Sequence, residues 1–118
     1  MVVSMTTVLH ADNVFAALAD ATRRDIVLRA IGGHEGIVEL AGHYPMSFAA
    51  VQKHVAVLEA AGLVVKEKRG REQIVRTEVR TVRRARELLD GIEELWRARV
   101  DRIDDLLAAE KRADRGTQ

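Results

Sequence analysis

The sequence predicts a mainly α-helical fold that includes one small β-hairpin. Three features of the chain predict it: two helical stretches separated by a short break, a basic hairpin directly after them, and a long amphipathic helix toward the C-terminus. Its 118 residues, 47% of them hydrophobic, are enough for one modest core. We therefore expect a single domain over residues 12–111 whose last helix occupies 81–111, preceded by a flexible N-terminus over 1–11 and followed by a disordered tail over 112–118.

The stretch from Ser47 to Gly62 has the signals of one helix with a defined start and end. The Ser47 hydroxyl can accept a hydrogen bond from the free amides of a first turn, and Gly62 suits the left-handed position that closes a helix. Val51, Val55 and Leu58 recur at i, i+4 and i+7, which places them on one side of the helix. That side is predicted to face the core.

The opposite side of this helix has small and polar residues near its N-terminal end, namely Ala49, Ala50, Gln52 and Lys53. Small side chains let a backbone approach closely, and an amide and an ammonium can bind bases and phosphates. The major groove of DNA requires a surface of this kind. Because an ordinary amphipathic surface helix has a similar polar side, the neighbouring segments must decide between the two interpretations.

A shorter helical stretch lies at 36–41, and the break at 42–46 separates it from the helix that starts at Ser47. This order is typical of a helix-turn-helix, in which the first helix braces the second against a duplex. The upstream neighbour therefore favours the interpretation as a DNA-reading helix.

The segments 63–68 and 73–79 have the alternation of two short strands. The four residues between them include Gly70, which supplies the turn, and Arg69 and Arg71, which flank it. A basic hairpin that follows a helix-turn-helix is a wing. The predicted fold class is therefore a winged helix-turn-helix.

Positive charge is concentrated on the proposed reading helix and wing. Residues 47–80 contain seven Lys and Arg against four acids, a net charge of +3, whereas residues 1–46 contain three against five, a net charge of −2. The whole chain has a formal net charge of +1. Phosphate binding requires such a local positive charge, although a solvated surface of mixed charge would give the same numbers.

The composition excludes several classes of protein. Cysteine is absent, which excludes disulfides and thiolate metal sites. The first ten residues lack a basic segment followed by a long apolar one, and no apolar run approaches the roughly 20 residues that span a bilayer. We expect a cytoplasmic protein without a membrane partner. The only serines are Ser4 and Ser47, and neither a Gly-rich phosphate loop nor a convergent acid pair is present, so we expect no enzyme.

Two short helices are predicted before the helix-turn-helix, with Asp12 and Asp20 as their caps and Gly32 at the end of the second. Arg23 and Arg24 stand in the first turn of the second helix and oppose its dipole. This position is mildly unfavourable without an anionic partner, and both side chains could reach a DNA phosphate or a carboxylate such as that of Asp20. The residues expected to face inward are Val14, Phe15, Leu18, Ile26, Val27, Ala30 and Ile31.

The longest periodic segment runs from Thr81 to about Lys111 and corresponds to roughly 45 Å of helix. Its apolar stripe is too long to pack within one small domain, so a second copy of the chain is the simplest partner. The alternative is a helix folded back on its own core. The stripe consists of Val82, Ala85, Leu89, Ile92, Trp96, Val100, Ile103 and Leu107, and is widened by Leu88, Leu95 and Leu106.

Three motifs stand in a fixed order along the chain. They are Phe15-x-x-Leu18-Ala19-Asp20-Ala21-Thr22-Arg23-Arg24-x-Ile26, then Glu39-Leu40-Ala41, then Met46-Ser47-x-x-x-Val51-x-Lys53-His54-x-x-Val57-Leu58-Glu59-x-Ala61-Gly62-Leu63-Val64. Together they resemble the ArsR/SmtB family of winged helix-turn-helix repressors. The resemblance covers roughly residues 13–110, and the region of Trp96 is similar to a subgroup without recognised metal motifs.

This resemblance implies a homodimer with the first and last helices at its interface and 47–58 as the recognition helix. The resemblance also implies which residues contact DNA. In the recognition helix they are Ser47, Gln52, Lys53 and His54, and at the tip of the wing they are Arg69 and Arg71. The candidate interface residues are Phe15, Leu18, Leu88, Leu89, Ile92, Leu95, Trp96 and Ile103. The chain departs from the family pattern at Ala21, where proline is usual, and at Gln52, where serine is usual; the second departure leaves the operator sequence open.

Members of the family commonly bind metal through a cysteine pair before the recognition helix or through Asp and His on the last helix. Gly36 and Val38 stand at the cysteine positions here, and the last helix contains no histidine. We therefore expect no metal and no cofactor.

The expected function is a sequence-specific regulator of transcription, a repressor that binds an inverted repeat in double-stranded DNA as a homodimer. Two alternatives stay open. One is a winged-helix module that binds proteins and not DNA. The other is a metal-responsive sensor that uses His34, Glu35, Glu39 and His43.

Overall fold

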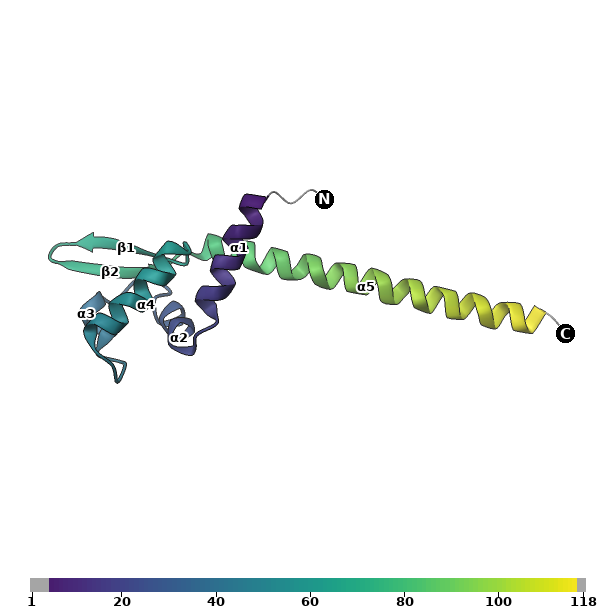
Figure 1. Ribbon diagram of the computed structural model, residues 1–118, viewed down its shortest axis with the longest axis horizontal. Coiled ribbons are helices and arrows are strands. Elements are labelled where there is room, and N and C mark those ends of the chain that lie inside the picture. Colours follow the sequence, from purple (N-terminus) through teal and green to yellow (C-terminus); the bar gives the residue numbers. More distant parts are fainter. Residues whose placement is uncertain (1–4, 117–118) are drawn as a thin grey trace. The chain divides into compact units, whose positions relative to one another are not determined.

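The computed structural model describes the backbone of residues 5–116 and the side chains of residues 12–116 (Figure 1). The fold is mainly α-helical with one two-stranded hairpin, which confirms the predicted fold class. One unit extends to Ala85, and the second begins at Arg86 and is helical as far as Gly116. The elements are α1 (Met5–Leu18), α2 (Ala21–Arg29), α3 (Ile37–Ala41), α4 (Phe48–Ala60), β1 (Val64–Arg69), β2 (Glu72–Thr77) and α5 (Val79–Gly116).

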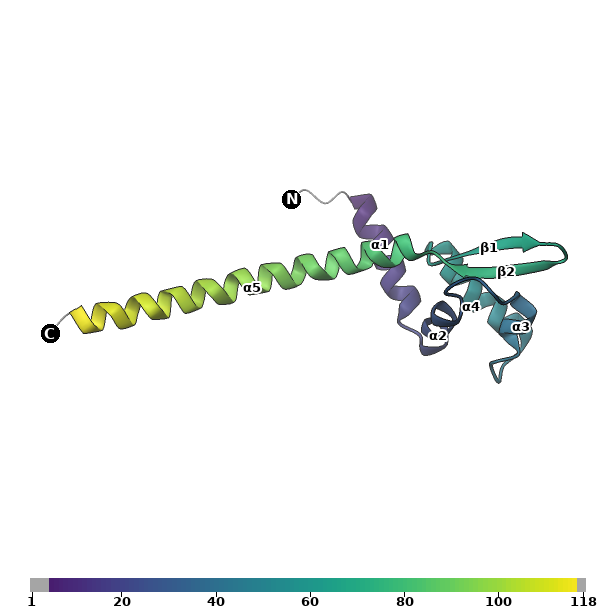
Figure 2. The same cartoon turned by 180° about the vertical axis from the view of Figure 1, so that it is seen from behind.

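Helix α4 lies at the centre of the first unit, in contact with α1, α2, α3 and β1 (Figure 2). The Ser47 hydroxyl accepts from the amide of Ala50 at 3.1 Å, and Gly62 has a φ of +76°, so both ends are as predicted. Val51, Val55 and Leu58 are fully buried. Because its caps and its apolar side are all fixed, α4 is a rigid platform for its exposed side.

The side chains of Arg23 and Arg24 bind the C-terminal end of α1. The Arg23 Nε donates to the carbonyl of Ala17 at 2.6 Å, and an Arg24 guanidinium nitrogen donates to the carbonyl of Leu18 at 2.8 Å. The predicted cap of α2 is present, since Asp20 accepts from the backbone amide of Arg23 at 3.0 Å. The two guanidinium groups therefore satisfy the free carbonyls of a helix end. The expected Asp20 partner is present for Arg23, whose backbone hydrogen bond and then whose charge lower the pKa of Asp20. The contact with a DNA phosphate stays a prediction.

The predicted start of the first helix was too late. Helix α1 begins at Met5, so Asp12 lies inside it and is not its cap, and residues 5–11 are helical. The stretch 5–11 contains no Gly or Pro that could stop a helix extending toward the N-terminus. The rest of the expected flexible N-terminus, residues 1–4, lies outside the described residues.

The last helix is longer than predicted at both ends. It begins at Val79, which had been assigned to a strand, and ends at Gly116. Residues 112–116, expected to belong to a disordered tail, are therefore helical. Good helix formers such as Arg and Ala dominate this segment, and polarity alone does not end a helix. Residues 117–118 of the expected tail lie outside the described residues.

Ile31 is 56% exposed, although the helical period of α2 predicts that it faces inward. The reason is that α2 ends at Arg29, with Ala30 as its C-cap, so Ile31 no longer follows the period. Of the other residues expected to face inward, Val14, Ile26, Val27 and Ala30 are buried, and Phe15 and Leu18 are half-buried.

The hairpin is antiparallel, and its ladder extends from the pair Val64 and Thr77 to the pair Arg69 and Glu72. The turn is shorter than predicted, because Arg69 and Glu72 belong to the strands. Gly70 adopts a φ of +61°, a left-handed conformation that a two-residue hairpin turn requires and glycine adopts without strain.

The base of the hairpin is attached to the helical part by buried hydrogen bonds. The Thr77 hydroxyl donates to the carbonyl of Val27 at 2.6 Å, and the amide of Val75 donates to the carbonyl of Glu35 at 3.2 Å. Ile74 also forms an isolated bridge with Gly36. The wing is therefore anchored at its base and exposed at its tip.

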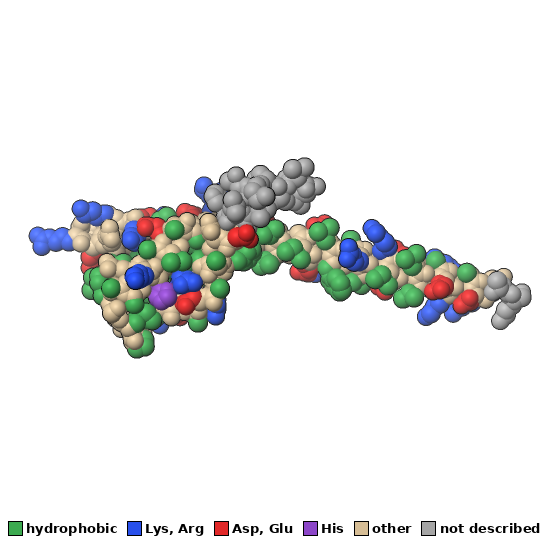
Figure 3. All heavy atoms as spheres, in the orientation of Figure 1, with side chains coloured by type: hydrophobic (Ala, Val, Ile, Leu, Met, Phe, Trp, Pro, Cys, Tyr) green, Lys and Arg blue, Asp and Glu red, His purple; other side chains and the backbone are tan. Residues whose placement is uncertain are grey.

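The described side chains of α5 include none that is buried. Figure 3 shows hydrophobic side chains along this helix between charged ones. Among the residues that the structure describes, no helix is long and apolar enough to cross a membrane.

Candidate DNA-binding surface

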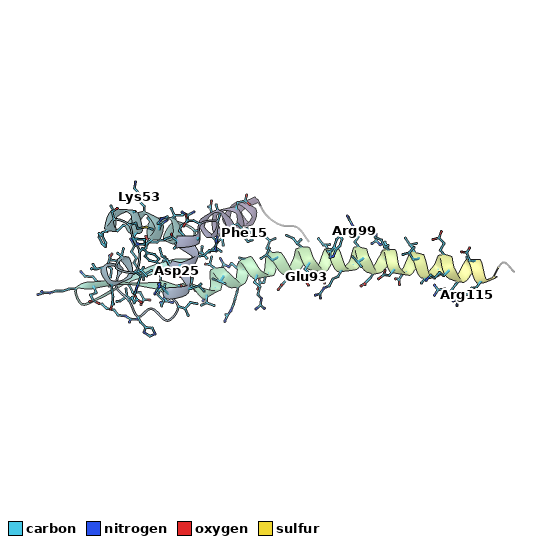
Figure 4. The ribbon with its side chains drawn as sticks, turned by 90° about the horizontal axis from the view of Figure 1, so that it is seen from below. Phe15, Asp25, Lys53, Glu93, Arg99 and Arg115 are labelled. Carbon is cyan, nitrogen blue, oxygen red and sulfur yellow. The ribbon has the colours of Figure 1, made fainter. Side chains whose placement is uncertain are left out.

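The exposed side of α4 is the candidate reading surface. Ser47, Ala49, Gln52 and Lys53 are exposed, and Ala50 is half-buried at the edge of this side. Figure 4 shows the side chain of Lys53 pointing away from the rest of the protein. The structure therefore brings together, near the N-terminal end of one helix, these five residues that the sequence assigned to DNA contact.

His54, also assigned to DNA contact, is half-buried, and its imidazole contacts the side chain of Arg23. Its Nδ1 lies 3.4 Å from a guanidinium nitrogen of Arg23, whose other nitrogens donate to the carbonyls of Ala16 and Ala17. This arrangement connects α4 to the C-terminal end of α1 through one side chain. Sequence reasoning missed this connection, although the unfavourable position of Arg23 in a first helical turn was a signal that it needed a partner.

The turn before α4 is fixed by Tyr44, which the sequence analysis treated only as part of a break. The Tyr44 hydroxyl donates to Asp25 at 2.6 Å, and the Nε of Arg29 donates to the same oxygen at 2.8 Å. These hydrogen bonds, first that of Tyr44 and then that of Arg29, lower the pKa of Asp25. Burial and the hydrogen bond to Asp25 raise the pKa of Tyr44. The start of the reading helix is therefore held to α2.

The two arginines of the wing have different surroundings. Arg69 donates to the carbonyl of Gly33 at 3.3 Å and lies 3.4 Å from Glu67, so part of its charge is engaged. Glu67 also accepts from Arg76 at 2.8 Å, and this hydrogen bond is the main cause of its lowered pKa. Arg71 is exposed and makes no hydrogen bond or ion pair with the residues that the structure describes. Basic side chains extend from the tip of the hairpin (Figure 3).

The fold matches solved structures of transcriptional regulators. An ArsR-like transcriptional regulator from Rhodococcus sp. RHA1 is 31% identical and superposes with a TM-score of 0.78, covering 86% of this chain and 96% of that one. This chain belongs to the ArsR family of transcriptional regulators. The resemblance drawn from the three motifs is thereby confirmed, and so is the winged helix-turn-helix fold of this ArsR-family protein.

Two further proteins are similar to this chain, one in part of its sequence and one in its fold. The HTH-type transcriptional regulator Rv2034 of Mycobacterium tuberculosis is 45% identical over 60 residues, which are 51% of this chain and 56% of that protein. A homodimeric winged helix-turn-helix DNA-binding domain, Mb0332 from Mycobacterium bovis, has a TM-score of 0.61 at 19% identity over 80% of this chain and 92% of that one, a likeness of fold. No protein-family model matches the sequence.

Two of the histidines and acids around α3 of this ArsR-family protein are in direct contact. The Nε2 of His43 lies 2.7 Å from Glu35. His34 and Glu39, the other two residues of the alternative metal site, do not complete a ligand set: within residues 12–116 no group of three or more His, Asp or Glu side chains could hold a metal ion. The geometry therefore gives no support to a sensor at this place.

The residues of α5 assigned to a dimer interface are exposed to solvent in the single chain. Trp96 is 65% exposed and Leu95 is 75% exposed, and Leu88, Leu89, Ile92 and Ile103 are exposed as well. Phe15 and Leu18 of α1 are half-buried. An apolar stripe of this length on one helix of a single chain is a surface that favours association.

Proposed function

We propose that this ArsR-family protein is a sequence-specific DNA-binding repressor that binds an inverted-repeat operator as a homodimer. The observation that supports this function most is the division of α4 into two sides. One side is fixed in the core by Val51, Val55 and Leu58, and the other exposes Gln52 and Lys53. A helix held in this way can enter a major groove without losing order on binding.

Each exposed group has a task that follows from its chemistry. The Gln52 amide can form two hydrogen bonds with an adenine edge, whereas Lys53 and Arg71 offer unpaired positive charge to phosphates. The side chains of Ala49 and Ala50 are small, so the backbone of α4 can approach the bases closely. Ser47, at the N-terminus of the helix, adds a hydroxyl close to the free amides, where a phosphate is stabilised.

The proposed homodimer accounts for the exposed stripe of α5 and gives the operator its symmetry. Two reading helices related by a two-fold axis contact successive major grooves on one side of a duplex, about 34 Å apart. The half-sites of the operator are therefore expected about one helical turn apart, in inverted orientation. Repression follows when the dimer occupies a promoter and blocks access to it.

A mobility-shift titration with the DNA upstream of the gene for this protein, at two salt concentrations, tests the function. Phosphate contacts predict a steep loss of affinity as salt rises, because bound counterions are released. Footprinting of the complex should show an inverted repeat. A matched control, Lys111→Ala, removes one exposed cation from the far part of α5 and should leave the binding curve unchanged. Absence of any shift at low salt would contradict the proposal and favour a winged-helix module that binds proteins.

A further inference from the structure

Phe48 is the first residue of α4, and 43% of its surface is exposed. The apolar residues that follow it on the core side of this helix, Val51, Val55 and Leu58, are fully buried. In sequence Phe48 continues the spacing of these residues by one turn, but in the structure a large part of its surface lies outside the core. The contacts proposed above for the reading surface make no use of this aromatic ring.

Phe48 lies one turn before Gln52, at the N-terminal edge of the reading surface. Residues four apart differ by about 40° around a helix axis and by about 6 Å along it. Ala49 lies about 60° from Gln52 in the other rotational direction and is exposed too. Side chains of a helix lean toward its N-terminus, so the ring of Phe48 extends toward the end of α4 that a reading helix directs at the base edges.

We propose that Phe48 is a specificity-determining residue that recognises thymine, through an apolar contact between its ring and the C5-methyl group of that base. The inference rests on the proposed function and adds a second base to those that α4 reads. Among the four bases, thymine alone presents a methyl group in the major groove, and an apolar side chain such as that of Phe is suited to contact it.

The other groups of the major groove do not suit an aromatic ring. Guanine presents two hydrogen-bond acceptors, adenine presents an acceptor and a donor, and cytosine presents a donor. A ring that covers one of these groups removes water from it and offers no hydrogen bond in return, which costs free energy. A phosphate requires a cation or a donor, and a phenyl ring is neither. The thymine methyl group is therefore the part of a duplex that Phe48 can bury favourably.

The distance between Phe48 and Gln52 limits where this thymine stands. The two residues are about 6 Å apart along the helix axis, and successive base pairs are about 3.4 Å apart along the duplex. The thymine is therefore expected within about two base pairs of the adenine that Gln52 contacts. Each half-site of the operator should contain both bases.

Replacing single thymines by uracil tests the contact without changing the protein. Uracil pairs with adenine as thymine does and differs only in lacking the C5-methyl group. Synthetic operator duplexes, each with uracil at one thymine of one half-site, are titrated with the wild-type protein at fixed salt. One thymine close to the Gln52 position should respond, and its replacement should weaken binding about fourfold, the factor that burial of one carbon contributes.

Variants of Phe48 assign the effect to its ring. For Phe48→Ala the difference between the thymine and uracil duplexes should disappear at that position, because no apolar group reaches the methyl. Alanine is a good helix former and keeps the backbone amides that the Ser47 cap uses, so α4 should persist, which far-UV circular dichroism checks. Phe48→Leu should keep a preference for thymine, since the contact needs an apolar group and not a ring.

Val57→Ala is the matched control. Val57 is also 43% exposed and lies on α4, but near its C-terminal end. Shortening it should leave the fourfold difference between thymine and uracil as it is in the wild type. A difference that persists in Phe48→Ala, or one that Val57→Ala removes as well, would overturn the assignment to Phe48.

The wild-type protein separates this inference from the proposed function. If it protects an inverted repeat and yet no thymine of the operator responds to uracil, the role of Phe48 is wrong and the function stands. If it binds no DNA, the function and the inference both fall.

Discussion

Gln52 and Lys53 are neighbours on α4, but they offer DNA different chemistry. An amide donates one hydrogen bond and accepts another, so it can recognise the edge of one base. An ammonium is a point charge that any phosphate satisfies. Both side chains are exposed on a helix whose other side is fixed, so their effects can be separated by mutation.

Replacing Gln52 by alanine should cost about 1–3 kcal/mol at the cognate site, because alanine cannot form the bidentate pair of hydrogen bonds with adenine. The same variant should tolerate base changes at that operator position. Mobility-shift titrations against a set of single-base operator variants at fixed salt measure both effects. Unchanged affinity and unchanged base preference together would show that α4 enters the groove in another orientation.

Lys53→Ala and Arg71→Ala should weaken binding to all sequences alike, and each should reduce the slope of the salt dependence by about one unit, because each removes one cation from a phosphate. Arg69→Ala is the matched variant in the same wing and should have a smaller effect, since Arg69 is engaged with Glu67 and the carbonyl of Gly33. Affinity measured over a range of salt gives the slopes. A larger slope change for Arg69→Ala than for Arg71→Ala would contradict this ranking.

Single residues were predictable where a local rule fixes them. Ser47 and Gly62 follow helix-capping rules, and the sequence placed both correctly. The partners of Arg23 and Tyr44 were not predictable, because they depend on which helix end or carboxylate the fold brings near, over separations of 6 and 19 residues. The sequence signalled that Arg23 needed a partner without identifying it.

Among the elements, α4 and the hairpin were predicted most closely, and α1 and α5 least closely at their ends. The ends of α4 are marked by a cap and a glycine, whereas α5 continues through polar helix formers without such a mark. The turn of the hairpin was predicted too long because Arg69 and Glu72 are polar, yet they pair in the ladder. Polarity indicates exposure and does not determine secondary structure.

The turn that links α3 to α4 depends on the hydrogen bond from Tyr44 to Asp25. Tyr44→Phe should lower the free energy of unfolding by about 1.5 kcal/mol, because it removes one hydrogen bond to a charged, partly exposed carboxylate and keeps the ring. Urea denaturation at neutral pH measures this decrease. DNA binding by the folded variant should weaken as well, since the start of the reading helix is less firmly held.

The effect of Tyr44→Phe should depend on pH in a defined direction. The pKa of Asp25 is lower in the folded state than in the unfolded state. The charged carboxylate therefore adds to the free energy of unfolding at pH values above its unfolded pKa. This stabilisation is lost as the pH falls through the folded pKa. The difference between wild type and variant should therefore shrink in acid. A difference that grows as the pH falls would show that another group is responsible.

At the scale of the whole molecule, the sequence supplies more apolar surface than one chain can bury. The described side chains of α5 include none that is buried, and Trp96 and Leu95 are largely exposed. The excess was visible in the sequence as a stripe longer than the domain, which is why a dimer could be expected. A stripe does not by itself give the orientation of a partner.

Charging the stripe should abolish the dimer. Burying one large apolar side chain contributes roughly 1.5–3 kcal/mol, so Leu89→Glu combined with Ile92→Glu should remove several such contributions and give a monomer by light scattering. The matched control, Ala98→Glu with Ala109→Glu, adds the same charge on the outer side of α5 and should stay dimeric.

The footprint of the monomer should shrink accordingly. One subunit retains one reading helix and one wing, so it should protect at most a half-site. Its affinity for the inverted repeat should also fall, because a monomer cannot bind both half-sites at the same time as a dimer does. Far-UV circular dichroism shows whether the variant keeps its helices. If the charged variant remains dimeric and still protects both half-sites, the α5 stripe is not the interface. The two copies must then associate through another surface. Phe15 and Leu18 of α1, which are half-buried, are the next residues to change.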